Sequence, residues 1–260
     1  MFKKVLASIL MSLVLMPQSF SMPTPVSVGG YLFPPFIYNE KDAIRGITID
    51  LIKLLNESQT EYIFDFHLTS SKRRYKDFSN KHYDLLFFED MRWGWKDKEI
   101  SPTKVILKGG EVFITHASNE RNQDFFKDLS GKKILGILGY HYKFANYNSD
   151  RVYLKENFNV ELRTNHLSNI HTIAKRNLTQ VAIVTKSLLK QFLKRFPHLK
   201  NKILISNELD QEYKHTILVR ENSRPTTEEV NSLIKKLYEE GQLKKLWDKY
   251  GIEQSDRISF

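Results

Sequence analysis

The residues best suited to chemistry lie in residues 87–95, FFEDMRWGW, where charged and aromatic side chains are mixed. Trp93 and Trp95 offer flat faces on which a planar or cationic group could stack, and Glu89 could supply the opposite charge. For this pattern, a small-molecule site and a structural role are equally open. The alternative is that the tryptophans cover a hinge and the acids are solvated, because exposed charged residues are the common case.

A second aromatic stretch, residues 28–38, reads VGGYLFPPFIY. Pro34 and Pro35 fix the backbone φ angle and remove two amide donors, so this loop is stiff and cannot extend a sheet. A stiff loop can hold aromatic rings as the apolar walls of a pocket. We favour this role for Phe33, whereas for Tyr31 and Phe36 a pocket wall and a core position stay equally open.

Signatures of other chemistry are missing from the sequence, which has no Walker loop, GxGxxG, HExxH or GxSxG motif. It has no cysteine, and hence no disulfide, thiolate metal site or thiol nucleophile. His166 and His171 are five residues apart, off the spacing of one helix face, and the other histidines are scattered. We therefore expect no catalytic residue, no metal and no cofactor.

Residues 1–21 have the pattern of a cleavable secretory signal, with Lys3 and Lys4 before an apolar run and a small-x-small cleavage site at Ser19-Phe20-Ser21. The apolar run is shorter than the roughly 20 residues that span a bilayer. Without a cysteine, no lipid can be attached there. We expect a freely diffusing periplasmic protein. Removing the two lysines lowers the formal charge from +10 to +8, and export argues against a nucleic-acid partner.

Beyond the signal, strand-like and helix-like segments alternate, which favours an α/β sheet fold. Residues 62–68 alternate with a period of two, while residues 47–55 carry apolar side chains at helical spacing. The pattern restarts after residue 119, with separate strands expected at residues 201–206 and 215–222. The end is helical, and Thr226 and Glu229 are placed to form a capping box.

Four pieces of the sequence, in this order and spacing, resemble the bacterial extracellular solute-binding proteins of family 3, which bind polar amino acids for ABC importers. They begin with FPPFIY, YDLLFF, DLSGKK and HTILVRE, and they span residues 33–55, 83–103, 128–142 and 215–252. No single piece is specific to this family, but the agreement of all four pieces in order is specific.

The resemblance implies an α/β, two-lobe periplasmic binding protein fold of type II, the Venus-flytrap fold. Residues 22–115 and 219–260 would build lobe one, and residues 116–218 would build lobe two. Two hinge strands, at residues 111–117 and 215–221, would join the lobes. The ligand would lie in the cleft at the carboxyl ends of the strands.

The family's clamp for an amino acid is altered in this sequence. Where family members hold the ligand carboxylate with an arginine, the sequence has Lys96, and Arg92 four residues earlier is a possible substitute. Thr185 stands in place of an aspartate that holds the ligand amino group, and Gly139-Tyr140-His141 replaces a Gly-Thr-Thr turn. These changes argue against a standard α-amino acid as the ligand.

Arg73 and Arg74 would open a helix near the cleft, where an anion could bind, although we favour a solvated helix face. The expected ligand-binding residues are therefore Tyr31, Phe33, Phe36, Arg74, Glu89, Arg92, Trp93, Lys96, Tyr140, His141 and Thr185.

The resemblance implies that a monomer captures a small polar solute by cleft closure and hands it to an ABC permease. Two alternatives stay open. The protein could report its ligand to a membrane signalling partner instead. It could also be an enzyme similar to periplasmic cyclohexadienyl dehydratases, with Glu89 or His141 as the acid.

Overall fold

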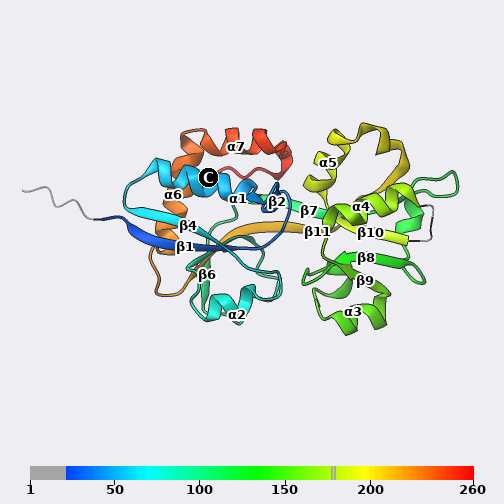
Figure 1. Cartoon of the computed structure of the whole chain (residues 1–260), viewed down its shortest axis with the longest axis horizontal. Helices are drawn as coiled ribbons and strands as arrows, with labels where there is room; N and C mark the ends of the chain where they lie inside the picture. The colour runs from blue at the N-terminus through cyan, green and yellow to red at the C-terminus, as the bar shows by residue number, and fades with distance from the viewer. Residues whose placement is uncertain (1–21, 177, 179) are drawn as a thin grey trace, which may run out of the picture.

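The computed structural model describes residues 22–176, 178 and 180–260, and the expected signal at residues 1–21 lies outside them. The described chain forms two α/β lobes, one at each end of the long axis (Figure 1). Within these ranges, no helix is both long and apolar enough to span a membrane.

The first lobe is built on four strands in the order β4 (Tyr62–Leu68), β1 (Thr24–Gly30), β5 (Leu85–Glu89) and β11 (Ile203–Arg220). β1 pairs in parallel with β4 and β5, β11 runs antiparallel to β5, and β6 (Ile100–Pro102) pairs with β11. Helices α1 (Ile47–Ser58), α6 (Thr227–Glu239) and α7 (Gln242–Tyr250) lie on one side of this sheet, and α2 (Arg74–Ser79) lies on the other (Figure 1).

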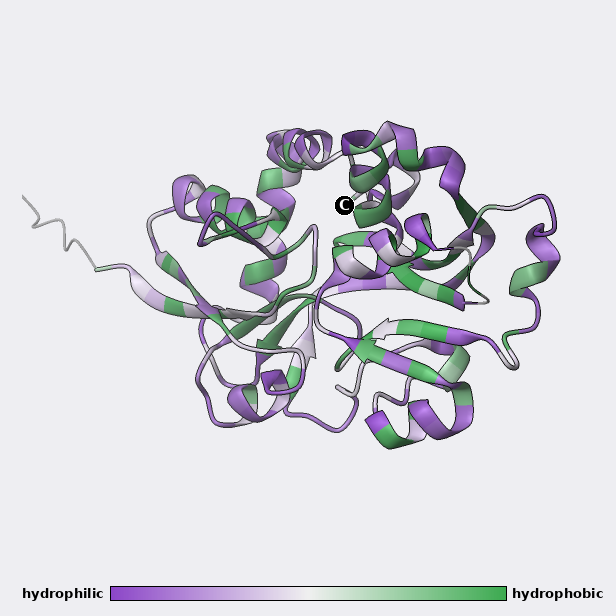
Figure 2. Ribbon diagram, turned by 45° about the vertical axis from the view of Figure 1, so that its right-hand side comes forward, coloured by the Kyte–Doolittle hydropathy of each residue, from purple (hydrophilic) through white to green (hydrophobic). Residues whose placement is uncertain are grey.

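The second lobe continues the sheet with β7 (Leu107–His116), β10 (Gln180–Thr185), β8 (Lys133–Ile137) and β9 (Val160–Arg163). Helices α4 (His166–Lys175) and α5 (Lys186–Arg195) cover one side, and α3 (Arg151–Phe158) covers the other. Figure 2 shows that hydrophobic residues concentrate on these strands, while the helices are largely hydrophilic. The remaining elements are the hairpin β2 (Tyr38–Glu40) and β3 (Ala43–Arg45) and the 3₁₀ turns Gln123–Phe126, Lys143–Ala145, Pro197–Lys202 and Gln254–Asp256.

Strands β7 and β11 run through both lobes and form the two-stranded connection that the resemblance implied (Figure 1). The separate strands expected at residues 201–206 and 215–222 are one 18-residue strand. Residues 207–214, NELDQEYK, contain no glycine or proline, so pairing with β7 continues across two register shifts, after Ile205 and after Leu209.

The expected lobe boundaries at residues 115 and 218 fall inside these shared strands. Glu111 to Ile114 of β7 already pair with β10 of the second lobe, and Thr216 to Val219 of β11 pair with β5 of the first. Each expected boundary thus lies within a continuous strand, and the structure marks no division between the lobes at either residue. The two boundaries therefore remain a prediction.

The helical patterns read from the sequence correspond to buried faces. Ile47, Leu51 and Leu55 of α1 are buried against the first sheet. At the start of α6, the Glu229 amide donates to the Thr226 hydroxyl at 3.3 Å and the Thr226 amide donates to the Glu229 carboxylate at 2.6 Å, which confirms the capping box.

Candidate ligand-binding site

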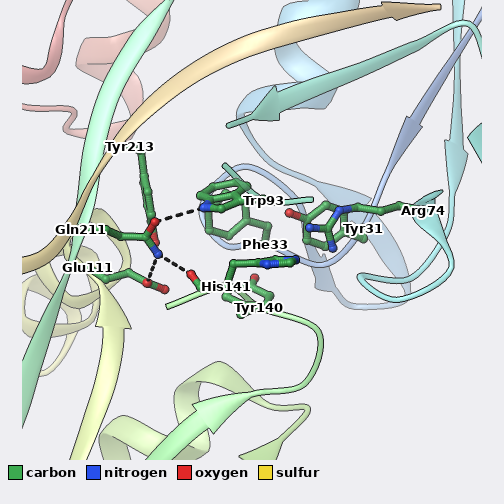
Figure 3. A pocket seen from close by; sticks show the side chains of 9 residues that line it. All are labelled: Tyr31, Phe33, Arg74, Trp93, Glu111, Tyr140, His141, Gln211 and Tyr213. Atoms are coloured by element: carbon green, nitrogen blue, oxygen red, sulfur yellow. Dashed lines mark hydrogen bonds between the residues drawn. The ribbon is translucent and has the colours of Figure 1, made fainter. Parts of the chain in front are cut away.

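Loops of both lobes and the two crossing strands converge on one cavity between the lobes (Figure 3). Its free volume is about 10 Å³, roughly the room that one water molecule needs. The side chains that line it are Tyr31, Phe33, Arg74, Trp93, Glu111, Tyr140, His141, Gln211 and Tyr213.

Aromatic rings from four segments form the wall of this cavity. The Phe33 ring meets Tyr140, Trp93 and Tyr213 edge-on, with centroids at 5.5, 5.8 and 5.9 Å. The loop holds Phe33 in place because its amide donates to the Ile37 carbonyl at 2.9 Å. The structure thus places Phe33 at the cavity, as expected.

Tyr31 and Phe36, the other two candidate residues of that loop, lie in different places. Tyr31 lines the cavity, whereas Phe36 turns away and packs on Phe88 and His215, with ring centroids 4.5 and 4.7 Å apart. Phe36 therefore lies in the core behind the wall, which is one of the two roles left open for it, and its contact with a ligand stays a prediction.

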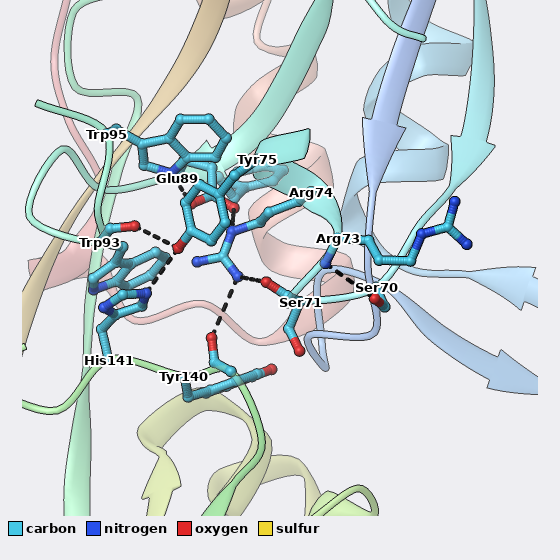
Figure 4. A network of polar contacts seen from close by, with 12 residues as sticks. Ser70, Ser71, Arg73, Arg74, Tyr75, Glu89, Trp93, Trp95, Tyr140 and His141 are labelled. Atoms are coloured by element: carbon cyan, nitrogen blue, oxygen red, sulfur yellow. Dashed lines mark hydrogen bonds and ion pairs between the residues drawn. The ribbon is translucent and has the colours of Figure 1, made fainter. Parts of the chain in front are cut away.

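Arg74 is almost completely buried at the floor of the cavity, so the solvated helix face that we favoured is wrong for this residue. Its guanidinium lies between the rings of Tyr31 and Tyr75, at 4.6 and 4.4 Å, and its Nε is 3.3 Å from a carboxylate oxygen of Glu89 (Figure 4). Burial alone lowers the pKa of Arg74, but the attraction of Glu89 and the nearby tyrosines raises it overall.

Glu89 is fully buried behind the cavity wall and does not line it, so it is not the expected counter-charge for a ligand. One carboxylate oxygen accepts from the Trp95 indole at 2.7 Å, and the other faces Arg74. Burial raises the pKa of Glu89, against the opposing influence of Arg74. Trp95 is itself a core residue with no exposed surface.

Two side chains of the second lobe reach across to the first. The His141 Nε2 atom forms a hydrogen bond with the Tyr75 hydroxyl at 2.7 Å, and the Nδ1 atom of the same ring lies 2.6 Å from the Tyr147 carbonyl oxygen. Burial and the charge of Arg74 lower the pKa of His141 to about 4. The Tyr140 hydroxyl donates to the Leu32 carbonyl at 3.1 Å.

Three further cavity residues, which the sequence motifs did not indicate, lie on the crossing strands: Glu111, Gln211 and Tyr213. The Gln211 amide donates to Glu111 Oε2 at 2.7 Å and to the His141 carbonyl at 2.5 Å, and the Trp93 indole donates to Gln211 Oε1 at 3.1 Å (Figure 3). A carboxyl inside the apolar stretch GEVFIT was the available signal for Glu111.

The model of one protein family, the bacterial extracellular solute-binding proteins, family 3, matches residues 27–253. The chain belongs to this family.

Solved structures share the fold of this family 3 protein at low sequence identity. An ArgBP mutant from T. maritima is 19% identical, with a TM-score of 0.67, over 88% of this chain and 96% of that one. The GluR0 ligand-binding core from Nostoc punctiforme, in complex with L-glutamate, is 18% identical, with a TM-score of 0.67, over 88% and 100%. An ABC uptake transporter substrate-binding protein from Streptococcus pneumoniae with bound histidine is 14% identical, with a TM-score of 0.68, over 89% and 94%. No curated protein sequence matches the chain.

Of the positions expected to replace the family 3 clamp, Tyr140 and His141 line the aromatic-walled cavity, whereas Lys96, Arg92 and Thr185 do not. Lys96 is exposed in the loop after β5. Arg92 is held by Asp90, with Nε and Nη2 at 2.8 and 2.6 Å from the two carboxylate oxygens, and it reaches the Tyr147 hydroxyl at 2.9 Å. Neither cation is in place for a ligand carboxylate in this conformation.

Thr185 lines a second cavity of about 10 Å³ with His166, Asn169 and other residues of the second lobe. This cavity shares Glu111 and Tyr140 with the first, so these two side chains separate the two spaces. The His166 ring lies 2.7 Å from the Tyr140 hydroxyl, and burial lowers its pKa to about 4. Thr185 is therefore near the site, behind Tyr140.

Proposed function

We propose that this family 3 protein captures a small polar solute between its lobes and delivers it to an ABC importer. The observation that carries the proposal is the convergence of side chains from both lobes and from both crossing strands on one aromatic-walled cavity. Six of the eleven residues expected from the sequence line this cavity, namely Tyr31, Phe33, Arg74, Trp93, Tyr140 and His141.

The lobes are in contact across the site in this structure. The Ser71 hydroxyl donates to the Leu138 carbonyl at 2.7 Å, and Arg74 donates to the Gly139 carbonyl at 3.3 Å. A cavity of about 10 Å³ holds no solute larger than water, so the lobes must separate or their side chains must move before a ligand enters. A ligand that touches both lobes then favours the closed arrangement through those contacts.

A thermal-unfolding screen of amino acids, amines, small peptides and organic acids tests the capture of a solute. We expect at least one compound to raise the unfolding temperature, because a ligand that binds only the folded state stabilises it. Phe33→Ala and Trp93→Ala should reduce that shift, whereas Tyr238→Ala, at an exposed ring on α6, should keep it. A folded protein that responds to no compound would contradict the proposal.

We further propose export to the periplasm, a monomeric state and a permease as the partner. Mass spectrometry of the exported protein should show loss of residues 1–21, and light scattering should give the mass of one chain. Permease and ATPase genes beside this gene would support import, whereas their absence would support a signalling partner.

The dehydratase alternative receives less support. Its two candidate acids were Glu89, which is paired with Arg74 behind the wall, and His141, whose ring nitrogens both have partners. Purified protein should not convert prephenate into an aromatic product.

A further inference from the structure

We propose that the ligand carries a cationic nitrogen and that Glu111, on the hinge strand β7, receives it and loses a proton in doing so. This inference rests on the proposed function and deepens it, because it names the charge of the solute and the residue that selects it.

The cations of the site already have anionic partners. Among the residues that line the aromatic-walled cavity, Arg74 is the one lysine or arginine, and the Glu89 carboxylate lies 3.3 Å from its Nε. Arg92 nearby is bound by Asp90 through two hydrogen bonds. An anionic ligand would therefore have to compete with a carboxylate that is already in contact with each guanidinium.

Unlike these cations, the carboxyl groups at the hinge end of the cavity form no ion pair within the described part of the chain. Glu111 is 2% exposed, and within the described part of the chain no lysine, arginine or histidine forms an ion pair with it. The carboxyl of Asp210 accepts hydrogen bonds from the backbone amides of Lys143 and Phe144 at 2.8 and 2.9 Å. This end of the cavity is thus short of positive charge.

The surroundings of Glu111 suit a cation. Figure 3 shows the Glu111 and Gln211 side chains at one end of the cavity, Arg74 at the other, and the rings of Trp93, Phe33 and Tyr140 between them. Aromatic faces attract a cation, and a neighbouring carboxylate adds direct charge pairing. Gln211 orients the Glu111 carboxyl by its 2.7 Å hydrogen bond and leaves the carboxyl able to accept from a ligand.

Binding at this carboxyl involves a proton. Burial raises the pKa of Glu111 to about 8, with the charge of Asp210 adding to the effect and hydrogen bonds from Gln211 and Tyr213 opposing it. At neutral pH the empty site therefore holds the protonated acid. When an ammonium or guanidinium group arrives, the carboxylate forms the ion pair and the proton passes to the solvent.

Other titratable groups face Glu111 from each neighbouring element. They are Asp210 and Tyr213 on β11, Tyr140, His141 and Tyr142 after β8, and His166 on α4, while Arg74 on α2 lies at the opposite end of the cavity. The two histidines have lowered pKa values of about 4, so they are neutral near pH 7 and release no proton there. The histidines therefore do not contribute to the proton count near pH 7, and the Glu111→Gln variant assigns that count to Glu111.

Calorimetric titration of the mature protein at pH 7, in buffers with different ionisation enthalpies, tests the inference. The probes are agmatine, putrescine, L-arginine and the dicarboxylate glutarate. We expect at least one amine or guanidine to bind with release of nearly one proton, and no binding of glutarate. The affinity for that probe should rise roughly fifty-fold from pH 6 to pH 8, as expected for an acid of pKa about 8 that must ionise.

Variants separate this role from a structural one. Glu111→Gln, which mimics the protonated side chain, should fold, bind the probe at least tenfold more weakly and release no proton. Glu111→Asp should retain proton release, and Glu212→Gln, at the half-exposed glutamate beside Gln211, should behave as the parent. If Glu111→Gln does not fold, the number of protons that the parent protein releases with each probe decides whether Glu111 receives the ligand.

The outcomes also separate this inference from the proposed function. Tight binding of glutarate, or binding of an amine with no proton release and an unaffected Glu111→Gln variant, would overturn the role of Glu111 and leave solute capture standing. If no compound binds in either this titration or the broader screen, the proposed function fails as well.

Discussion

Arg74 is the one lysine or arginine that is buried in the described part of the chain, with Glu89 as its anionic partner and two tyrosine rings around it. Arg74→Met removes the cation and leaves a buried carboxylate without a partner, which costs about 3–5 kcal/mol of unfolding free energy. Urea unfolding measures this loss. The double variant Arg74→Met, Glu89→Gln should recover part of it, and Arg73→Met, at an exposed side chain, should change little. A single variant as stable as the parent would show that the pair is not structurally important.

His141 should make stability depend on acidity. Its ordinary pKa of 6.5 falls to about 4 in the folded protein, because burial and Arg74 disfavour the charged ring. The unfolded chain therefore binds the proton first as the pH falls. Stability is fully present above pH 6.5, and up to about 3 kcal/mol is lost as the pH falls to 4.

Urea unfolding of His141→Gln across this range checks the effect. The variant should lose less stability between pH 6.5 and 4 than the parent, although buried His166 and His215 still contribute to the slope. The exposed-site variant His67→Gln should follow the parent. Identical slopes for the parent and His141→Gln would contradict the assignment.

At this scale the sequence predicted the aromatic residues better than the charged ones. Phe33 and Trp93 could be recognised because stiff or aromatic-rich loops after strands often reach a cleft. Glu111 offered only its place in the apolar stretch GEVFIT, because its partner Gln211 is 100 residues away and meets it only through the register of β7 and β11. Arg74 looked solvated because nothing local to α2 shows that Glu89 lies beneath it.

Among the elements, the loop that carries Phe33 and Phe36 depends on Gly46 before α1. Gly46 has φ of 132°, and an added Cβ would lie 2.2 Å from the Phe36 carbonyl oxygen. Gly46→Ala should therefore cost about 3 kcal/mol and displace this loop. Gly241→Ala, at φ of 70° with open space around it, should cost only roughly 1 kcal/mol. Thermal unfolding of the two variants should rank them in this order, and equal losses would refute the steric argument.

The elements themselves followed from sequence periodicity where a single face is buried, as in α1 and α6. The break expected within β11 is absent, because long-range pairing with β7 overrides a polar local sequence. Charged residues such as Glu208 and Glu212 lie on the exposed side of this strand, so their polarity reflects contact with solvent and not a loop.

For the whole molecule, lobe motion is the property to measure. If ligand entry requires the lobes to part, the free protein in solution includes open forms, and a saturating ligand should reduce the radius of gyration. Small-angle scattering of the protein with a compound from the thermal screen checks this. Trp93→Ala, which should bind poorly, provides the control. A scattering profile that stays unchanged with every tight-binding compound would exclude closure of the lobes.

The two-lobe arrangement could be recognised from sequence because four motifs agree in order over most of the chain. The charge pattern of the cleft could not, because it depends on which side chains of the two lobes meet when they come together.

The Tyr140 ring stands between two spaces that are each about 10 Å³, with its hydroxyl tied to the opposite lobe. The Tyr140 hydroxyl thus holds the two lobes together when no ligand is bound. Parting the lobes to admit a solute breaks this hydrogen bond, so the measured affinity will understate the strength of the ligand contacts by the free energy of that opening.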